Sequence, residues 1–441
     1  MFTKFRAIGK KFAIGFGELI RSMRISSVNI ILFVWLVSRS ASWIFLKPTI
    51  SPDSMEYLEM GKFFASLNFG EVDSNRPFGY AMLIAFLGAK PVLIVILQQT
   101  MSLLIALEIH KLLPNKRLTG IWRIVLPITY LLYPLTLFLE FQILSEIFTA
   151  FLLIKLASVV ILSKNRRLTT TLIMLMTLLS LILLVRPNVL PLALGLTLFT
   201  KIFQSIAKFK IIFFAFFLSF LIAGVSNFAI IGKVFPSSSA LTSGIAMHML
   251  DAIPGYDANP ALSGFISRAE FEVRVNSPGS KFWAVQSGAK AYTDSGNENV
   301  QDELLKMDIA LLKDYPLLFV ESFFGSFFSI FYDNPNAFLP HQRIHLPSQA
   351  LLISFLYALF FQFALLLLCL LMFSRDFSVK LREIRANYPT IYLNSSLFLT
   401  LGVNALVSPI EQNRYMFPLI PVMMIVCSGF FKQIKDEKDN D

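Results

Sequence analysis

The segment Ser51–Tyr80, SPDSMEYLEMGKFFASLNFGEVDSNRPFGY, is polar and acidic and follows directly on the apolar run Val28–Leu46, VNIILFVWLVSRSASWIFL. The apolar run has the roughly 20 residues that a helix needs to cross a bilayer. The polar segment places charged residues such as Asp53 and Arg76 immediately outside that first span. Most of the later chain returns to apolar runs, so the sequence predicts chemistry at a membrane surface.

Composition restricts the class of fold. Of 441 residues, 55% are hydrophobic, 45 are Phe and only 15% are charged. A soluble domain cannot cover that much apolar surface. Backbone groups in lipid must pair within their own segment, and the apolar runs are far too long for barrel strands. We therefore expect an all-α polytopic membrane protein, with about ten or eleven transmembrane helices and one larger extracytoplasmic loop.

The net charge of +11 comes from clusters of Lys and Arg between the apolar runs. Cytoplasmic loops are rich in these residues, so the pattern predicts orientation, and no nucleic-acid partner is expected. Attraction to anionic membrane lipid is a secondary interpretation. Residues 1–25 interleave basic and aromatic side chains, which is typical of an amphipathic helix on the cytoplasmic surface. The segment Ser51–Tyr80 is then extracytoplasmic, and a bacterial inner membrane is the expected location.

The distribution of polar residues predicts five regions. They are the basic N-terminus 1–25, an N-terminal transmembrane module 26–232 with a first extracytoplasmic loop 48–80, an extracytoplasmic region 233–315, a C-terminal transmembrane module 316–431 and a cytoplasmic tail 432–441. After the first span, we expect further spans near 91–112, 121–138, 142–162, 168–185, 187–203, 210–232, 349–373, 389–408 and 413–431.

The apolar run Pro316–Phe331 has two interpretations. It is either an eleventh span or a helix that lies in, or re-enters from, the outer interface. About 16 residues are marginal for crossing a bilayer. The interfacial interpretation also keeps the basic loop around Arg375 and Arg385 cytoplasmic, so we favour it.

The start of the polar segment has a structural and a functional interpretation. Pro52-Asp53-Ser54-Met55-Glu56 resembles a helix start, with Asp53 as N-cap and Glu56 bonding back to it. Alternatively, Asp53 is a carboxylate that accepts a proton from an acceptor hydroxyl. Tyr57 shares this helical face, although tyrosines there are commonly interface anchors. Arg76 would reach lipid headgroups or bind a phosphate through its forked donors.

Four more charged residues lie within or at the ends of apolar runs, namely Arg39, Glu146, Arg186 and Arg414. A charge at the bilayer centre costs about 2.5–3.5 kcal/mol on insertion scales, so such residues persist when they are paired or face a polar cavity. In the expected topology all four lie on the same side as Asp53. They would form structural ion pairs, such as Glu146 with an arginine, or bind an anionic lipid headgroup.

Few patterns indicate a metal or a nucleotide. His341 and His345 have the i,i+4 spacing of a zinc site, but prolines flank them and no third ligand is evident. No P-loop, GxGxxG, HExxH or GxSxG pattern occurs in a supporting context. We expect no metal and no cofactor, with a divalent metal as an open alternative. Gln98 and Gln99, inside an apolar run, are expected to hydrogen-bond neighbouring helices.

Several short motifs occur in an order that resembles the GT-C superfamily, in particular the branch of protein O-mannosyltransferases and lipid A aminoarabinose transferases. They are Pro52-Asp53-Ser54-x-x-Tyr57-Leu58-x-Met60-Gly61-Lys62, Arg76-Pro77-x-Gly79-Tyr80, Ile143-Leu144-Ser145-Glu146, Val185-Arg186-Pro187-Asn188 and Asn413-Arg414-Tyr415-x-x-Pro418. The chain departs from the family pattern at Ser54, where many members have Glu, and at Phe78, where a second Pro is usual.

The resemblance implies an inverting glycosyltransferase that moves a sugar from a polyprenyl-phosphate donor to a glycan, glycolipid or protein acceptor of the cell envelope. It makes Asp53 the catalytic carboxylate, Arg76, Arg186 and Arg414 candidates for binding the donor phosphate, and Glu146 a candidate for acceptor or supporting contacts. Their expected position on the same side adds Arg39 to the phosphate candidates. It also adds Glu56, Tyr57, Glu411 and Tyr415 to the acceptor or supporting group.

Two other classes of function stay open. A flippase for lipid-linked oligosaccharides, or another polytopic transporter, would carry polar residues through the whole depth of the bundle. The expected clustering of charges on one face argues against transport. A non-catalytic membrane scaffold would leave that clustering of arginines unexplained.

Overall fold

The computed structural model describes residues 26–67, 76–113, 122–162, 167–198, 206–232, 300–329, 396–404 and 416–425, with a few positions between 356 and 367. Within these residues the regular structure is helical, and the only β pairing is an isolated parallel bridge between Thr49 and Gln142. The all-α expectation is confirmed for the described part of the chain.

Four helices are long and apolar enough to cross a membrane: α2 (Ser27–Phe45), α5 (Pro91–Leu112), α9 (Leu168–Val185) and α11 (Ile206–Ile231). A fifth candidate is the pair α6 (Trp122–Leu132) and α7 (Pro134–Phe141), which is bent by 49°. The other described elements are α3 (Pro52–Ala65), α4 (Gly79–Phe86), α8 (Glu146–Ile161), η3 (Pro187–Val189), α10 (Leu190–Leu198), α16 (Val300–Asp314), α17 (Pro316–Ser329) and η7 (Phe417–Leu419). The other expected spans are shorter helices here or extend outside the described residues.

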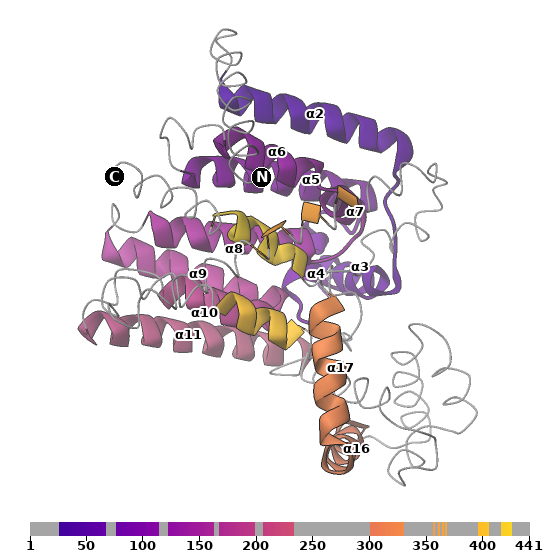
Figure 1. The fold of residues 1–441 in the computed structure, drawn as a ribbon, viewed down its shortest axis with the longest axis vertical. Coiled ribbons are helices and arrows are strands. Elements are labelled where there is room, and N and C mark those ends of the chain that lie inside the picture. The colour runs from indigo at the N-terminus through magenta and orange to yellow at the C-terminus, as the bar shows by residue number, and fades with distance from the viewer. Residues whose placement is uncertain are drawn as a thin grey trace, which may run out of the picture.

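The long helices lie side by side in a bundle (Figure 1). α2 forms one edge and α11 the other, and α8 lies in the middle with most of its residues buried. Large apolar side chains such as Phe33 on α2 and Phe228 on α11 are more than 60% exposed, as expected for lipid-facing helices. α3 and α4 pack together at the end of the bundle where α2 finishes, which we call the α3 end.

Prolines define several helix boundaries at the α3 end. α9 stops at Arg186, which adopts φ −158° and ψ 85° because the following Pro187 disfavours a helical residue before it. Tyr133 leaves the helical region ahead of Pro134 in the same way, and this produces the bend between α6 and α7. The spans expected at 121–138 and 142–162 leave a short turn at residues 139–141, and this turn is wrong, since α7 continues through Phe141 and the chain turns at residues 142–145.

The start of α3 corrects another expectation. The N-cap is Ser51, whose hydroxyl accepts a hydrogen bond from the Ser54 amide at 3.2 Å, and Pro52 occupies the first helical position. Asp53 lies one position further into the helix and is not the cap. Because a serine hydroxyl satisfies the exposed amide, the carboxylate of Asp53 can point toward another group.

Two glycines bring α3, α4 and α9 into close contact. A Cβ atom at Gly79 would lie 2.8 Å from the carbonyl oxygen of Leu184, at the end of α9. A Cβ atom at Gly61 on α3 would lie 2.7 Å from Ile84 Cγ2 on α4. These small residues allow backbones to approach closely, which is the usual basis of helix packing in membranes. As a result, α3, α4 and the end of α9 at Arg186 lie close together.

α17 runs across the direction of the long helices in Figure 1. The described part of this helix covers 14 residues, Pro316–Ser329. Leu317, Val320 and Phe324 are exposed and share one helical face by their i, i+3, i+7 spacing. Whether this segment spans the membrane or lies in the interface stays a prediction.

We expect Gly79→Ala to destabilise the protein by about 1–3 kcal/mol, because the new methyl group meets backbone atoms that cannot rotate away. Thermal unfolding in detergent measures the change. Gly325→Ala is the matched control, since a Cβ atom there has nothing within 4 Å. Equal effects of the two substitutions would contradict the close packing of α4 on α9.

Candidate functional site

Asp53, Glu56 and Arg76 form an ion-pair cluster at the α3 end. Arg76 Nη2 lies 2.6 Å from Asp53 Oδ1, and Arg76 Nε donates to Glu56 Oε2. The two carboxylates lie three residues apart, on one face of the first turns of α3. The side chains of Asp53 and Arg76 are 29% and 28% exposed, so a ligand can reach both.

Aromatic packing places the guanidinium of Arg76. Its Cζ atom lies 5.3 Å from the centre of the Tyr57 ring, in a cation–π contact. Burial by itself lowers the pKa of Arg76, but attraction to Tyr57, Asp53 and Glu56 outweighs it and raises the pKa above its ordinary value. Arg76 is therefore a permanent cation that faces two carboxylates.

Tyr80 connects this cluster to a second one. The rings of Tyr57 and Tyr80 meet edge to face at 5.0 Å, and both are buried. Burial raises the pKa of Tyr80 well above its ordinary value, and the nearby charge of Glu146 raises it further. Tyr80 is thus a neutral phenol that lies between the Tyr57 ring and the Glu146 carboxylate.

The second cluster is the pair of Glu146 and Arg186. Glu146 is the first residue of α8 and Arg186 ends α9, and Arg186 Nη1 lies 3.0 Å from Glu146 Oε1. Their side chains are 0% and 10% exposed. An arginine in such a place is retained with a carboxylate partner, since either charge alone would be costly to bury. This pairing is one of the two alternatives that the sequence left open.

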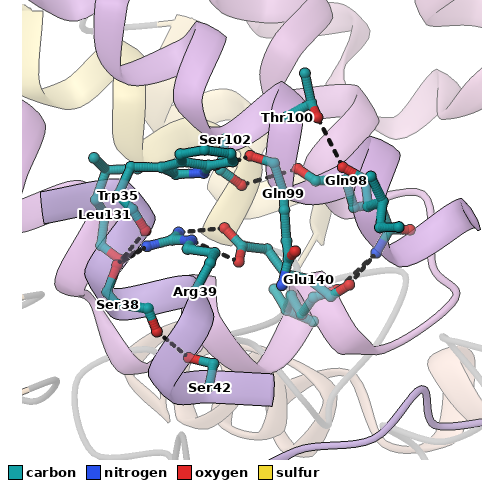
Figure 2. A network of polar contacts seen from close by, with 12 residues as sticks. Trp35, Ser38, Arg39, Ser42, Gln98, Gln99, Thr100, Ser102, Leu131 and Glu140 are labelled. Atoms are coloured by element: carbon teal, nitrogen blue, oxygen red, sulfur yellow. Dashed lines mark hydrogen bonds and ion pairs between the residues drawn. The ribbon is translucent and has the colours of Figure 1, made fainter. Parts of the chain in front are cut away.

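Arg39 lies in a separate network that the sequence analysis missed in part (Figure 2). It donates through Nε to Glu140 Oε2 at 3.0 Å and through Nη1 to the Leu131 carbonyl at 2.8 Å, and Nη2 also contacts Glu140. The side chains of Arg39 and Glu140 are 3% and 0% exposed. Arg39 is therefore enclosed by protein, and its guanidinium is not presented to a ligand in this conformation.

Glu140 could have been found from the sequence. It is an acid inside the apolar run Pro134–Phe141, and such a residue needs a buried cation. The expected turn at residues 139–141 made it look exposed. Once α7 is helical through Phe141, Glu140 points into the bundle beside α2.

The structure thus brings six predicted residues into two linked clusters and leaves Arg39 apart. The linked residues are Asp53, Glu56, Tyr57, Arg76, Glu146 and Arg186. Arg414, Glu411, Tyr415, His341 and His345 lie outside the described residues. Within the described residues no group of three or more His, Cys, Asp or Glu side chains could hold a metal ion.

Near Arg186, an asparagine pair joins the C-terminal part of the chain to this region. Asn188 Nδ2 donates to Asn404 Oδ1 at 2.8 Å, which fixes the helix containing residues 396–404 against η3. η7 (Phe417–Leu419) packs against α8, whose first residue is Glu146. Asn404 is thus held against η3, which follows Arg186 in the sequence, and η7 lies against α8.

The chain was compared with known proteins. No protein-family model matches it, and no curated protein and no solved structure does so either.

The buried Arg39–Glu140 pair should behave as one unit. Arg39→Met alone should lower the free energy of unfolding by about 3–5 kcal/mol, because it strands Glu140 in an apolar environment. Adding Glu140→Leu should recover much of that loss. Lys111→Met is the control, since Lys111 is 53% exposed and its partner Glu108 is 3.7 Å away; it should cost about 1 kcal/mol or less. Additive losses in the double variant would contradict the pairing.

Proposed function

We propose that this protein is an integral-membrane inverting glycosyltransferase of the GT-C type, which uses a polyprenyl-phosphate sugar as donor. The observation that supports it best is the partly exposed Asp53 carboxylate beside the Arg76 cation, linked through Tyr57 and Tyr80 to Glu146 and Arg186. All lie at one end of an apolar bundle. A donor with its hydrocarbon tail between lipid-facing helices would present its phosphate at that end.

The proposed chemistry needs a base and a cation. The acceptor oxygen attacks the anomeric carbon, the bond from that carbon to the phosphate oxygen breaks, and the acceptor proton passes to Asp53. The transition state has oxocarbenium character, and the leaving phosphate carries the negative charge away. Fixed guanidinium groups stabilise that charge without a metal. The acceptor would be a glycan, glycolipid or protein of the cell envelope.

Arg76 has a specific part in this proposal. Two carboxylates share its guanidinium. A donor phosphate would compete with them for the same N–H groups, because guanidinium binds phosphate and carboxylate with similar forked geometry. Capture of Arg76 by the phosphate would weaken its contact with Asp53 and leave that carboxylate available to the acceptor hydroxyl. Donor binding would thereby prepare the base.

One observation favours a second candidate, a transporter of lipid-linked oligosaccharides. The broken pair α6–α7 carries the buried Glu140, which pairs with Arg39 of α2, and broken helices with buried charges line substrate paths in many transporters. A transporter would move a lipid-linked glycan between leaflets of a proteoliposome without forming a glycosidic bond.

Asp53→Asn tests the proposal. Proton transfer to a positioned carboxylate contributes about 100- to 10,000-fold, so the variant should lose at least 100-fold in kcat. The measurement is sugar transfer by purified protein with a panel of polyprenyl-phosphate sugars. Glu59→Gln, an exposed acid on the same helix, is the matched control and should keep its activity. Near-normal transfer by Asp53→Asn, or lipid flipping without transfer by the wild type, would overturn the proposal.

A further inference from the structure

We infer that Gln98 is a positioning residue for the candidate site, an inference that rests on the proposed function. Gln98 lies within the membrane-spanning helix α5 and is 1% exposed. A buried amide in an apolar helix is costly unless all its polar atoms are satisfied. Both polar atoms of the Gln98 amide are hydrogen-bonded, and its oxygen contacts Tyr80, which links the two clusters of the site.

Three backbone carbonyl groups surround the amide nitrogen of Gln98. Its Nε2 atom lies 3.0 Å from the Leu139 oxygen, 2.9 Å from the Glu140 oxygen and 2.7 Å from the Gln142 oxygen. These carbonyls belong to the last turn of α7 and the residue that follows it. Figure 2 shows Gln98 on α5 near Glu140. The contact ties the end of the broken span to α5.

These three carbonyl groups determine the orientation of the Gln98 amide. Carbonyl oxygens only accept, so the nitrogen must face them and Oε1 must face the other way. There Oε1 accepts a hydrogen bond from the Tyr80 hydroxyl. Tyr80 must therefore be the donor, which agrees with its raised pKa and neutral phenol.

The position of Tyr80 in turn determines how the two clusters meet. The Tyr80 ring contacts the ring of Tyr57, which in turn contacts the Arg76 guanidinium. The centres of the Tyr80 ring and the Phe148 ring on α8 are 6.4 Å apart. Tyr80 also interacts electrostatically with Glu146, whose charge raises the pKa of its hydroxyl. Fixing the hydroxyl therefore fixes the spacing between the Asp53–Arg76 cluster and the Glu146–Arg186 cluster.

Gln99 provides an unusually close control. It is the next residue of α5, is 4% exposed, and accepts a hydrogen bond from Trp43 Nε1 on α2 at 3.1 Å. It therefore makes a helix-to-helix contact at the same depth, away from Tyr80. The Gln99 side chain makes this one hydrogen bond and the Gln98 side chain makes four, so the two variants are compared by their effect on kcat and on exchange in α3 and α4, and not by their global stability.

The experiment compares Gln98→Leu, Tyr80→Phe, their double variant and Gln99→Leu in purified full-length protein. Small misplacements of a site can cost about 100-fold in rate. We expect Gln98→Leu and Tyr80→Phe each to lower kcat by roughly 10- to 100-fold, with KM for the donor changed less. The double variant should lose no more than the worse single variant, because both changes remove one interaction. Gln99→Leu should keep its kcat within a few-fold of the wild type.

Hydrogen exchange supplies a measurement that does not need activity. Gln98→Leu should increase exchange in α3 and α4, and Gln99→Leu should not. Equal exchange and equal kcat in these two variants, or additive losses in the double variant, would overturn the inference. If Gln98→Leu does not fold, Tyr80→Phe against Gln99→Leu decides by the same criteria. If the wild type transfers no sugar, the proposed function fails, and exchange alone then decides whether Gln98 fixes α4.

Discussion

Pairing of charges inside an apolar helical bundle is the constraint on which the described structure depends. Arg39 and Arg186 cannot be buried alone, and each has a carboxylate from a different helix, Glu140 or Glu146. Each pair fixes the rotation and depth of the two elements that carry it. Arg39 joins α2 to the end of α7, and Arg186 joins the end of α9 to the start of α8. The two ion pairs thereby fix the position of α2 relative to α7 and of α9 relative to α8.

The site at the α3 end follows from this register together with local sequence features. Ser51 and Pro52 begin α3 so that Asp53 lies in its first turn, and Gly79 lets α4 approach the last turn of α9. Arg76 lies between these two helices and closes the cluster by binding carboxylates of α3. No single contact is strong at this partly exposed position. The aromatic contact of Tyr57 and the buried hydroxyl of Tyr80 supply the rigidity that the ion pairs lack.

The sequence predicted the helical class and the apolar runs that became α2, α5, α9 and α11, and it offered the pairing of Glu146 with an arginine as one of two alternatives. These are local or strongly periodic signals. The cap at Ser51 and the course of α7 through Phe141 were predicted wrongly, because competing cap residues and short turns differ by little energy. The partners of Arg76, Arg39 and Gln98 described above lie 18 to 101 positions away along the chain and required the packed structure. Periodicity does not encode which rotation a helix adopts against its neighbours.

The most direct measurement is a cryo-electron microscopy structure of the protein with a polyprenyl phosphate bound. We expect the phosphate at the α3 end, within hydrogen-bonding distance of Arg76 or Arg186, and one carboxylate contact of that arginine replaced by phosphate oxygen. The polyprenyl tail should run along lipid-facing helices. A phosphate bound elsewhere, with Arg76 still between Asp53 and Glu56 and Arg186 still on Glu146, would contradict the claim that these clusters form a site for a lipid-borne anion.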